Sequence, residues 1–277
     1  MANSRRILSL ALTLMLMLLC TSASAGKELS PAALLADDVY ERKVYGYSEM
    51  GQDMACHRVG RPDAEIRILM TFGVHGFEDH HDHDGLVLTS IAESLIGYYL
   101  AHTDELEGFA LYIVPYANPD GLRYGETEDG FGRCNLYGLD INRDFPTKWK
   151  HVNRGRYKNG PEPFSTAEAR SIRNLVEDVQ PTIGIDVHGW INGVYGDQEL
   201  AQPFCKALDC EYRRDISSGM LHQWYNEVLD GGIMIELAGS PSRAGYVQDM
   251  TRKLIKGLEG WITLRREKTA NELTPIP

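Results

Sequence analysis

The stretch 182–188, TIGIDVH, carries the pattern that decides the fold. Its isoleucines and valine alternate with polar residues, so they point to one side of a strand while Asp186 and His188 point to the other. Pro181 precedes the stretch, and a run of apolar residues at helical spacing ends at Val179 just before it. A helix followed directly by a buried strand is a recurring unit of α/β domains.

Similar patterns recur along the chain, which shows no internal repeat and no low-complexity linker. Strand-type apolar runs lie at residues 53–59, 65–72, 109–116 and 233–237. Helical spacing of apolar residues is found at 84–102, 165–179 and 246–265, with Asp84 and the capping box STAE at 165–168 as helix starts. We therefore expect one α/β domain, with helices on both faces of a mixed, largely parallel twisted sheet.

The net charge and the first 25 residues limit the classes of protein to which this chain can belong. The chain has 277 residues, and its net charge of -11 argues against nucleic acid as a partner. Arg5 and Arg6, the apolar run at 7–20 and the small residues at 23–25 are typical of a cleaved signal peptide. We expect a signal peptide at 1–25, one large domain at 26–266 and a tail at 267–277, in an exported monomer that does not span a membrane. A lipoprotein signal with Cys20 acylated is the alternative.

Four cysteines remain after the expected signal peptide. An even number of cysteines in an exported protein favours disulfides. We expect the pairs Cys205–Cys210 and Cys56–Cys134. Four free and mostly buried thiols are the alternative.

Three residues suggest a metal site. His75 and Glu78 follow the strand at 65–72 within the tetrapeptide HGFE, and His188 ends the strand at 182–188. Two histidines and one glutamate are a ligand set of catalytic zinc sites that leave a fourth position open for water. Because ligands of such sheets bind at the carboxyl ends of strands, His75 and His188 should lie close together. A short H-x-x-E motif also occurs by chance, and an isolated histidine at a strand end is more often structural.

Glu236 is the next candidate, because it interrupts the apolar run IMIELA at 233–238. Burial among apolar residues raises the pKa of a carboxyl group toward the range useful for a general base. The alternative is an edge strand on which Glu236 faces water.

Residues 122–164 form a long irregular stretch, which in a compact domain is usually functional. Arg143 offers a planar donor fork suited to a carboxylate, and Asn142 adds a neutral donor. Arg133 lies in the same stretch. Surface ion pairs are the alternative role for both arginines.

With these residues in place, the chain resembles the zinc carboxypeptidase family. Six motifs occur in that family's order: YSEMGQ (47–52), HGFE (75–78), NPDG (118–121), GLDINR (138–143), DVH (186–188) and IEL (235–237). RCN at 133–135, followed by DINRDFP at 140–146, is most similar to the murein-peptide amidase branch, whose members cut the γ-D-glutamyl–diaminopimelate bond. Asp144 departs from the family, since many members have asparagine there.

The resemblance implies a role for each residue. One zinc ion would be held by His75, Glu78 and His188. Asp140 would orient the imidazole of His75, and Glu236 would act as the base for the attacking water. Further roles are implied for oxyanion stabilisation (Arg133), for the substrate carboxylate (Asn142 and Arg143) and for the specificity pocket (His222 or its neighbour Leu221).

The segment DHHDHD at 79–84 contains three further histidines close to the predicted ligands. His80, His81 and His83 could bind a second metal ion. The alternative is an exposed polar loop that leads into the helix at Asp84.

These observations together predict an exported zinc metallocarboxypeptidase or amidase. It would hydrolyse a peptide bond next to a free carboxylate, with peptidoglycan stem peptides as the expected substrate. Two alternatives remain. One is an aspartoacylase- or succinylglutamate desuccinylase-like deacylase of N-acyl amino acids. The other is a non-catalytic zinc-containing protein that binds peptides.

Overall fold

The computed structural model describes residues 38–124, 132–214 and 217–272. These residues belong to one compact unit, residues 35–277. The predicted signal peptide at 1–25 lies outside the described residues. None of the described helices is long and apolar enough to cross a bilayer.

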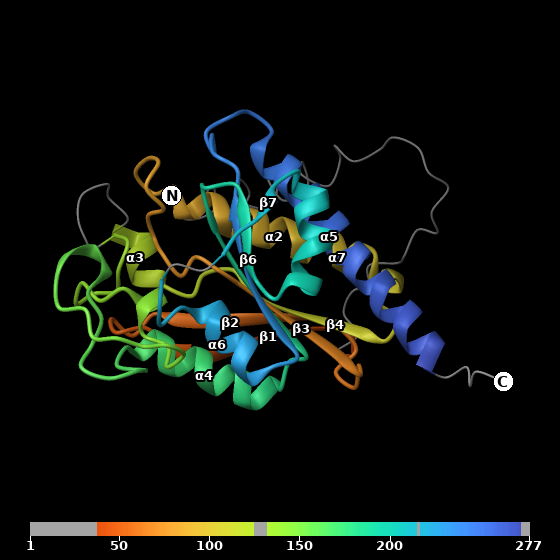
Figure 1. Ribbon diagram of the computed structural model, residues 1–277, viewed down its shortest axis with the longest axis horizontal. Coiled ribbons are helices and arrows are strands. Elements are labelled where there is room, and N and C mark those ends of the chain that lie inside the picture. Colours follow the sequence, from red (N-terminus) through yellow and green to blue (C-terminus); the bar gives the residue numbers. More distant parts are fainter. Residues whose placement is uncertain (1–37, 125–131, 215–216, 273–277) are drawn as a thin grey trace, which may run out of the picture. The chain divides into compact units, whose positions relative to one another are not determined.

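A mixed sheet forms the centre of this unit, as the alternating patterns predicted (Figure 1). Within the described residues it has eight strands in the order β1 (Tyr40–Tyr47), β2 (Asp53–Gly60), β4 (Phe109–Val114), β3 (Ile66–Phe72), β5 (Ile183–Gly189), β8 (Gly231–Leu237), β6 (Gly193–Gly196) and β7 (Glu211–Tyr212). The central strands β4, β3, β5 and β8 run parallel to one another. β1 and β2 on one side and β6 on the other add antiparallel pairs.

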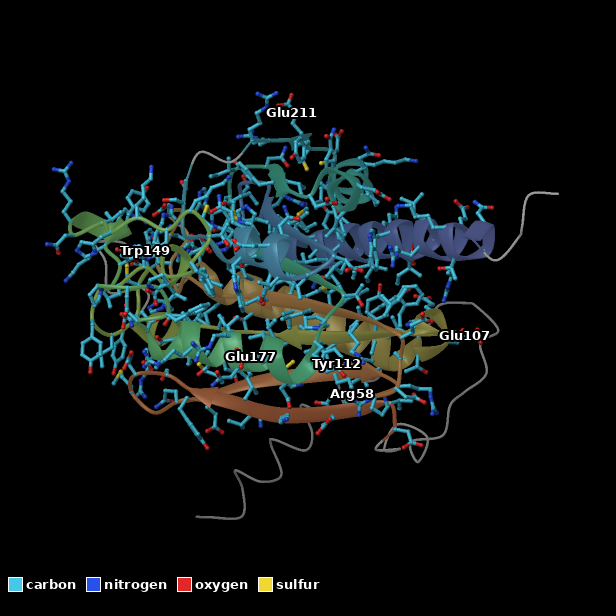
Figure 2. All side chains as sticks on the ribbon, turned by 60° about the horizontal axis from the view of Figure 1, so that its bottom comes forward. Arg58, Glu107, Tyr112, Trp149, Glu177 and Glu211 are labelled. Atoms are coloured by element: carbon cyan, nitrogen blue, oxygen red, sulfur yellow. The ribbon has the colours of Figure 1, made fainter. Side chains whose placement is uncertain are left out.

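Helices cover both faces of the sheet (Figure 1). One face carries α2 (Gly85–Ala101), α5 (Gln198–Leu208) and α7 (Tyr246–Glu272), and the other carries α4 (Ala167–Val179) and α6 (Leu221–Val228). Figure 2 turns the second face toward the reader, with Glu177 marking α4. The predicted fold class is confirmed.

The buried apolar residues form one cluster on each face of the sheet. In β5, Ile183, Ile185 and Val187 pack toward α2, α5 and α7, as their alternation predicted. On the opposite face Gly184 leaves room for the ring of Tyr225 on α6, because a Cβ there would lie 2.3 Å from that ring. Since both faces are covered, all seven residues of β5 are buried.

Short helices that the sequence did not indicate lie at the start of the irregular stretch and within it. They are α3 (Pro119–Tyr124) and the 3₁₀ turns Ile141–Arg143 and Gly155–Tyr157; a further 3₁₀ turn, Thr103–Leu106, follows α2. The strands β1, β6 and β7 and the helices α5 and α6 were also not predicted. The strands β6 and β7 and the helix α6 are short, and β1 carries mixed polar and apolar residues. In α5 the buried residues Leu200, Ala201, Phe204 and Leu208 do recur at helical spacing, and the prediction overlooked them.

Two helix boundaries differ from the prediction. The prediction of a capping box at 165–168 is wrong. The residue that caps α4 is Thr166, whose hydroxyl accepts the N–H of Ala169 at 3.1 Å. Glu168 instead accepts the N–H of Glu49 at 3.1 Å, which ties α4 to the segment after β1. The last helix, α7, extends to Glu272, beyond the expected end near residue 265 and past the expected start of the tail.

All four cysteines of the described chain are free thiols, so the predicted disulfides are wrong for this structure. Cys56 is buried in the apolar cluster beneath α4. Cys134 lies in the irregular stretch, where its thiol donates to the carbonyl of Arg156 at 3.4 Å. The backbone N–H of Cys210 donates to the carbonyl of Cys205 at 3.1 Å and closes α5 without an S–S bond.

Asp144 makes the stability of this fold depend on pH. Its carboxylate accepts the N–H and the hydroxyl of Thr166 at 2.8 and 2.9 Å. Burial raises the pKa of Asp144 to about 6, although the bonds from Thr166 oppose the rise. An unfolded aspartate ionises near pH 4, so the folded state loses stability as the pH rises from about 4 through about 6.

We therefore expect the variant Asp144→Asn, which cannot ionise, to escape this loss. Relative to the wild type, its free energy of unfolding should improve by about 2 kcal/mol between pH 4 and pH 7.5. Urea unfolding at the two pH values measures the difference. The same difference at both values would contradict the assignment.

Candidate active site

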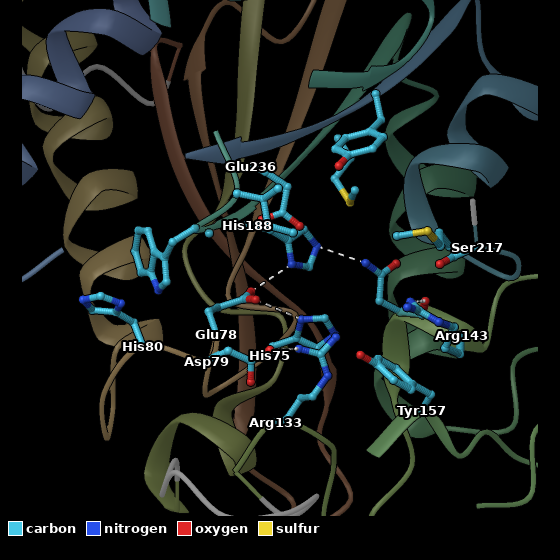
Figure 3. A pocket seen from close by; sticks show the side chains of 17 residues that line it. His75, Glu78, Asp79, His80, Arg133, Arg143, Tyr157, His188, Ser217 and Glu236 are labelled. Atoms are coloured by element: carbon cyan, nitrogen blue, oxygen red, sulfur yellow. Dashed lines mark hydrogen bonds and ion pairs between the residues drawn. The ribbon is translucent and has the colours of Figure 1, made fainter. Parts of the chain in front are cut away.

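The carboxyl ends of three neighbouring parallel strands meet at one edge of the sheet. β3 ends at Phe72, which pairs with Val187 of β5, and His75 follows three residues later. In the pairing of β5 with β8, His188 lies opposite Glu236. Residues far apart in the sequence thus meet at one site (Figure 3).

The predicted ligands converge there. Nδ1 of His75 lies 3.3 Å from one carboxylate oxygen of Glu78, and Nδ1 of His188 lies 2.8 Å from the other. Within the described ranges, these three side chains are the one group of His, Cys, Asp or Glu close enough to share a metal ion, with ligand atoms within 4.8 Å of one another. All three side chains are buried.

The far nitrogen of each imidazole is held by a carboxylate. Nε2 of His75 lies 2.9 Å from Asp140, and Nε2 of His188 lies 2.9 Å from Asp186. A carboxylate at one ring nitrogen fixes the tautomer and leaves the lone pair of Nδ1 free for a metal. Two such nitrogens and one carboxylate facing each other fit a zinc ion.

The charges of the site agree with this arrangement. Burial alone would raise the pKa of Glu78, but His188 and His75 lower it to about 2. For Asp140, the opposing effect of burial is likewise outweighed, and His75 and Arg133 hold its pKa well below the usual range. Both carboxylates are therefore ionised at neutral pH.

Asp84 holds the loop that carries the first ligands. We expected it to cap α2, but its side chain makes no cap bond. The buried carboxylate instead accepts the backbone N–H of Glu78 at 2.6 Å and that of His80 at 2.9 Å. It also accepts the indole N–H of Trp190 at 2.8 Å. Because Trp190 directly follows β5, Asp84 connects the loop that carries His75 and Glu78 to the end of the strand that carries His188.

A pocket of about 370 Å³ opens above the ligands. The three predicted ligands line it, together with four other predicted site residues: Arg133, Asn142, Arg143 and Glu236. Asp140 lies behind His75 rather than in the pocket. Several other lining residues were not predicted from the sequence: Tyr157, Trp190, Ile191, Tyr195, Ser217, Met220 and Met234.

Glu236 lies in the interior of the sheet, since β8 pairs with β5 on one side and β6 on the other. The alternative of a water-facing edge strand is therefore excluded. Burial raises the pKa of Glu236 to about 8, although the nearby His188 opposes the rise. This makes it a stronger base than an exposed carboxylate.

Tyr157 packs between the two predicted arginines. The guanidinium groups of Arg133 and Arg143 lie 5.6 and 5.2 Å from its ring centroid, within the range of cation–π contact. Arg133 also lies 3.6 Å from Asp140, and the pKa of its guanidinium is raised by Asp140 and Glu78 against the effect of burial. Neither arginine is a free surface side chain. Only the irregularity of the stretch around Tyr157 could have suggested its role.

Of the predicted substrate-binding residues, Asn142 lines the pocket and His222 does not. The amide oxygen of Asn142 accepts the N–H of Leu221 at 2.8 Å, and its NH₂ group lies 3.1 Å from Nε2 of His188, the ring nitrogen that also faces Asp186. His222 is fully buried in α6 and does not line the pocket. Its prediction as a pocket residue is wrong for this structure, because α6 packs against β8 and presents Met220, just before the helix, to the pocket.

The histidine loop does not form a second site among the described residues. His80 lines the rim of the pocket. Nδ1 of His81 lies 2.9 Å from the carbonyl of Asp82, and Nδ1 of His83 lies 3.4 Å from the carbonyl of Leu122. These contacts agree with the alternative of a polar loop.

Comparison with known proteins adds to this geometry. The sequence pattern of the family described as zinc carboxypeptidase matches residues 34–214. The chain is 33% identical over 208 residues to bacteriocin BCN5 of Clostridium perfringens, covering 72% of this chain and 23% of that protein. It is 25% identical over 154 residues to carboxypeptidase B of Astacus astacus, covering half of each. The chain thus spans half or less of the length of these relatives.

Two solved structures are similar in fold. One is a murein-tripeptide amidase from Escherichia coli O157, with a TM-score of 0.58 and 18% identity over 78% of this chain and 91% of that one. The other is bovine thrombin-activatable fibrinolysis inhibitor, with a TM-score of 0.64 and 14% identity over 80% of this chain and 88% of that one. At these identities the likeness concerns the fold.

The bonds of Asp84 lead to a prediction about metal binding. In the variant Asp84→Asn, one oxygen replaces two, and an added NH₂ group faces the N–H donors. We expect this variant to bind zinc about 10- to 100-fold more weakly, as measured by competition with a chelator. The variant Asp82→Asn, which removes the same charge from an exposed side chain of the loop, is the control. Wild-type affinity of Asp84→Asn would show that the ligands do not depend on Asp84.

Proposed function

Because this chain belongs to the zinc carboxypeptidase family, we propose that it hydrolyses a peptide bond next to a free carboxylate of its substrate. One observation carries the proposal. A buried carboxylate, Glu236, lies directly opposite His188 in the strand pairing and faces the same pocket as Arg133 and Arg143. A base, a metal-ligand set and two cations around one pocket are the groups that amide hydrolysis requires.

The metal would be held by His75, Glu78 and His188. When bound there, zinc supplies Lewis acidity and lowers the pKa of water. We propose one ion, in agreement with the single group of ligands in the described chain. Asp140 and Asp186 keep the two imidazoles in the orientation that presents Nδ1 to the ion.

Glu236 would take the proton from the attacking water and pass it to the leaving amine. The raised pKa that burial gives this carboxyl group suits both halves of the task, because the group has to accept a proton and then release it. Its oxygens point into the pocket, close to the ligands (Figure 3).

The two arginines would serve different parts of the substrate. Arg133, fixed by Asp140 and Tyr157, would stabilise the negative charge that develops on the carbonyl oxygen. Arg143 would bind the substrate carboxylate through its guanidinium fork. Because the amide oxygen of Asn142 is bonded to the N–H of Leu221 and its NH₂ group lies beside His188, we assign the carboxylate to Arg143 and a positioning role to Asn142.

We further propose that the protein is exported and acts on peptidoglycan stem peptides. The signal-like residues 1–25 and the motifs RCN and DINRDFP support this proposal. The fold similarity to a murein-tripeptide amidase agrees with it. Incubating purified muropeptides with the zinc-loaded protein, with and without a chelator, tests it by mass spectrometry. Chelator-sensitive loss of a stem-peptide residue is the expected result, and unchanged masses would contradict this substrate.

The variant Glu236→Gln tests the mechanism. Glutamine keeps the shape of the side chain but cannot accept the proton, so kcat/KM should fall by about 10²- to 10⁴-fold. Zinc binding should persist, because Glu236 is not among the proposed ligands. The variant Glu65→Gln, at an exposed position just before β3, is the control. Undiminished hydrolysis of every tested peptide by Glu236→Gln would contradict the proposed role.

A further inference from the structure

One segment of this acidic chain has the opposite charge. Residues 145–161 contain five basic side chains and no acidic one, although the whole chain has a net charge of -11. Three of the five, Lys148, Lys150 and Arg154, are exposed, and we call them the basic rim. Among the described residues, no carboxylate forms an ion pair with any of these three; Arg156, by contrast, is paired with Asp79.

The basic rim adjoins the catalytic pocket. A shallow hollow lined by Lys148, Trp149 and Lys150 shares Ser217 with that pocket. Tyr157, from the same segment as the rim, lines the catalytic pocket itself. In Figure 3, Ser217, Arg143 and Tyr157 lie on one side of the pocket. A substrate bound in the catalytic pocket can therefore reach the rim over Ser217.

The segment is held firmly against Arg143. The buried side chain of Asn159 donates to the carbonyls of Arg143 and Lys150, both at 2.9 Å, and accepts the N–H of Val152 at 2.8 Å. These bonds tie the backbone of the rim to that of the arginine proposed to bind the substrate carboxylate. The charges of the rim thus stand in a fixed relation to the pocket.

Lys148 lies in a hydrogen-bonded turn. Its φ is +55°, in the left-handed region that favours glycine, within a turn in which Trp149 N–H donates to the carbonyl of Pro146 at 3.0 Å. This hydrogen-bonded turn fixes the backbone at Lys148 and Trp149.

We infer that the basic rim binds acidic side chains of the peptide substrate, in addition to the carboxylate that Arg143 holds. This inference rests on the proposed function and narrows its substrate class to peptides with a second carboxylate. An acidic peptide fits better than a nucleic acid, because the rim continues into a pocket equipped for amide hydrolysis while the chain as a whole is acidic. Exposed charges attract moderately and are screened by salt.

A set of matched peptides tests this inference. The peptides share their C-terminal residue and differ only in Glu, Gln or Lys at the second, third or fourth position before it. At low salt we expect kcat/KM to follow Glu > Gln > Lys at one of these positions, with Glu about three- to tenfold above Gln. The preference should shrink in about 0.5 M NaCl, where charges are screened over a few ångströms.

Reversing the charge of the basic rim provides a second test of the inference. In the double variant Lys148→Glu/Lys150→Glu, the preference for Glu over Lys should be lost or reversed. The double variant Lys253→Glu/Lys256→Glu on α7 changes the net charge equally and should keep the wild-type preference.

Three outcomes are decisive against the inference. Equal kcat/KM for the three peptides, with the Gln peptide cleaved, would overturn it and leave the proposed function intact. An equal loss of preference in both double variants would assign the effect to net charge rather than to the rim. If the zinc-loaded protein cleaved none of the peptides, the proposed function would fail, and the inference with it.

Discussion

The site depends on the parallel pairing of β3, β5 and β8 at the centre of the sheet. This pairing brings the end of β3 beside β5 and sets His188 directly opposite Glu236. A shift of the register by one residue would turn His188 and Asp186 to the opposite face of the sheet. The register is secured by apolar residues on both faces of the strands, so the packing of the core also fixes the geometry of the site.

A second constraint acts on the loops beyond the strands. The buried carboxylate of Asp84 gathers N–H donors from the loop after β3 and from Trp190 after β5. The nearby carboxylates Asp140 and Asp186 orient the two imidazoles. Carboxylates therefore lie both beside the imidazoles and beneath the ligand-bearing loop. Their negative charge favours a cation between the ligands. Arg133 and Arg143 restore positive charge on the side where an anionic substrate would bind.

Periodicity in the sequence predicted the central strands and three of the helices, whereas features that depend on contacts between distant segments were missed. The alternation at 182–188 predicted β5, and the interruption of an apolar run by a carboxylate predicted the buried Glu236, which lies beyond the residues that the family pattern matches. The role of Asp84 was misread, because a residue before a helix usually caps that helix. Tyr157 lies in a stretch without periodicity, and the displacement of His222 depends on how α6 packs on β8.

The central claim is that this chain hydrolyses a peptide bond beside a free carboxylate held by Arg143. The most direct measurement compares one peptide as its free acid and as its C-terminal amide, with products followed by mass spectrometry. We expect the zinc-loaded protein to cleave the acid and kcat/KM for the amide to be at least about tenfold lower, since an ionic hydrogen bond is removed. Equal cleavage of acid and amide would contradict the claim.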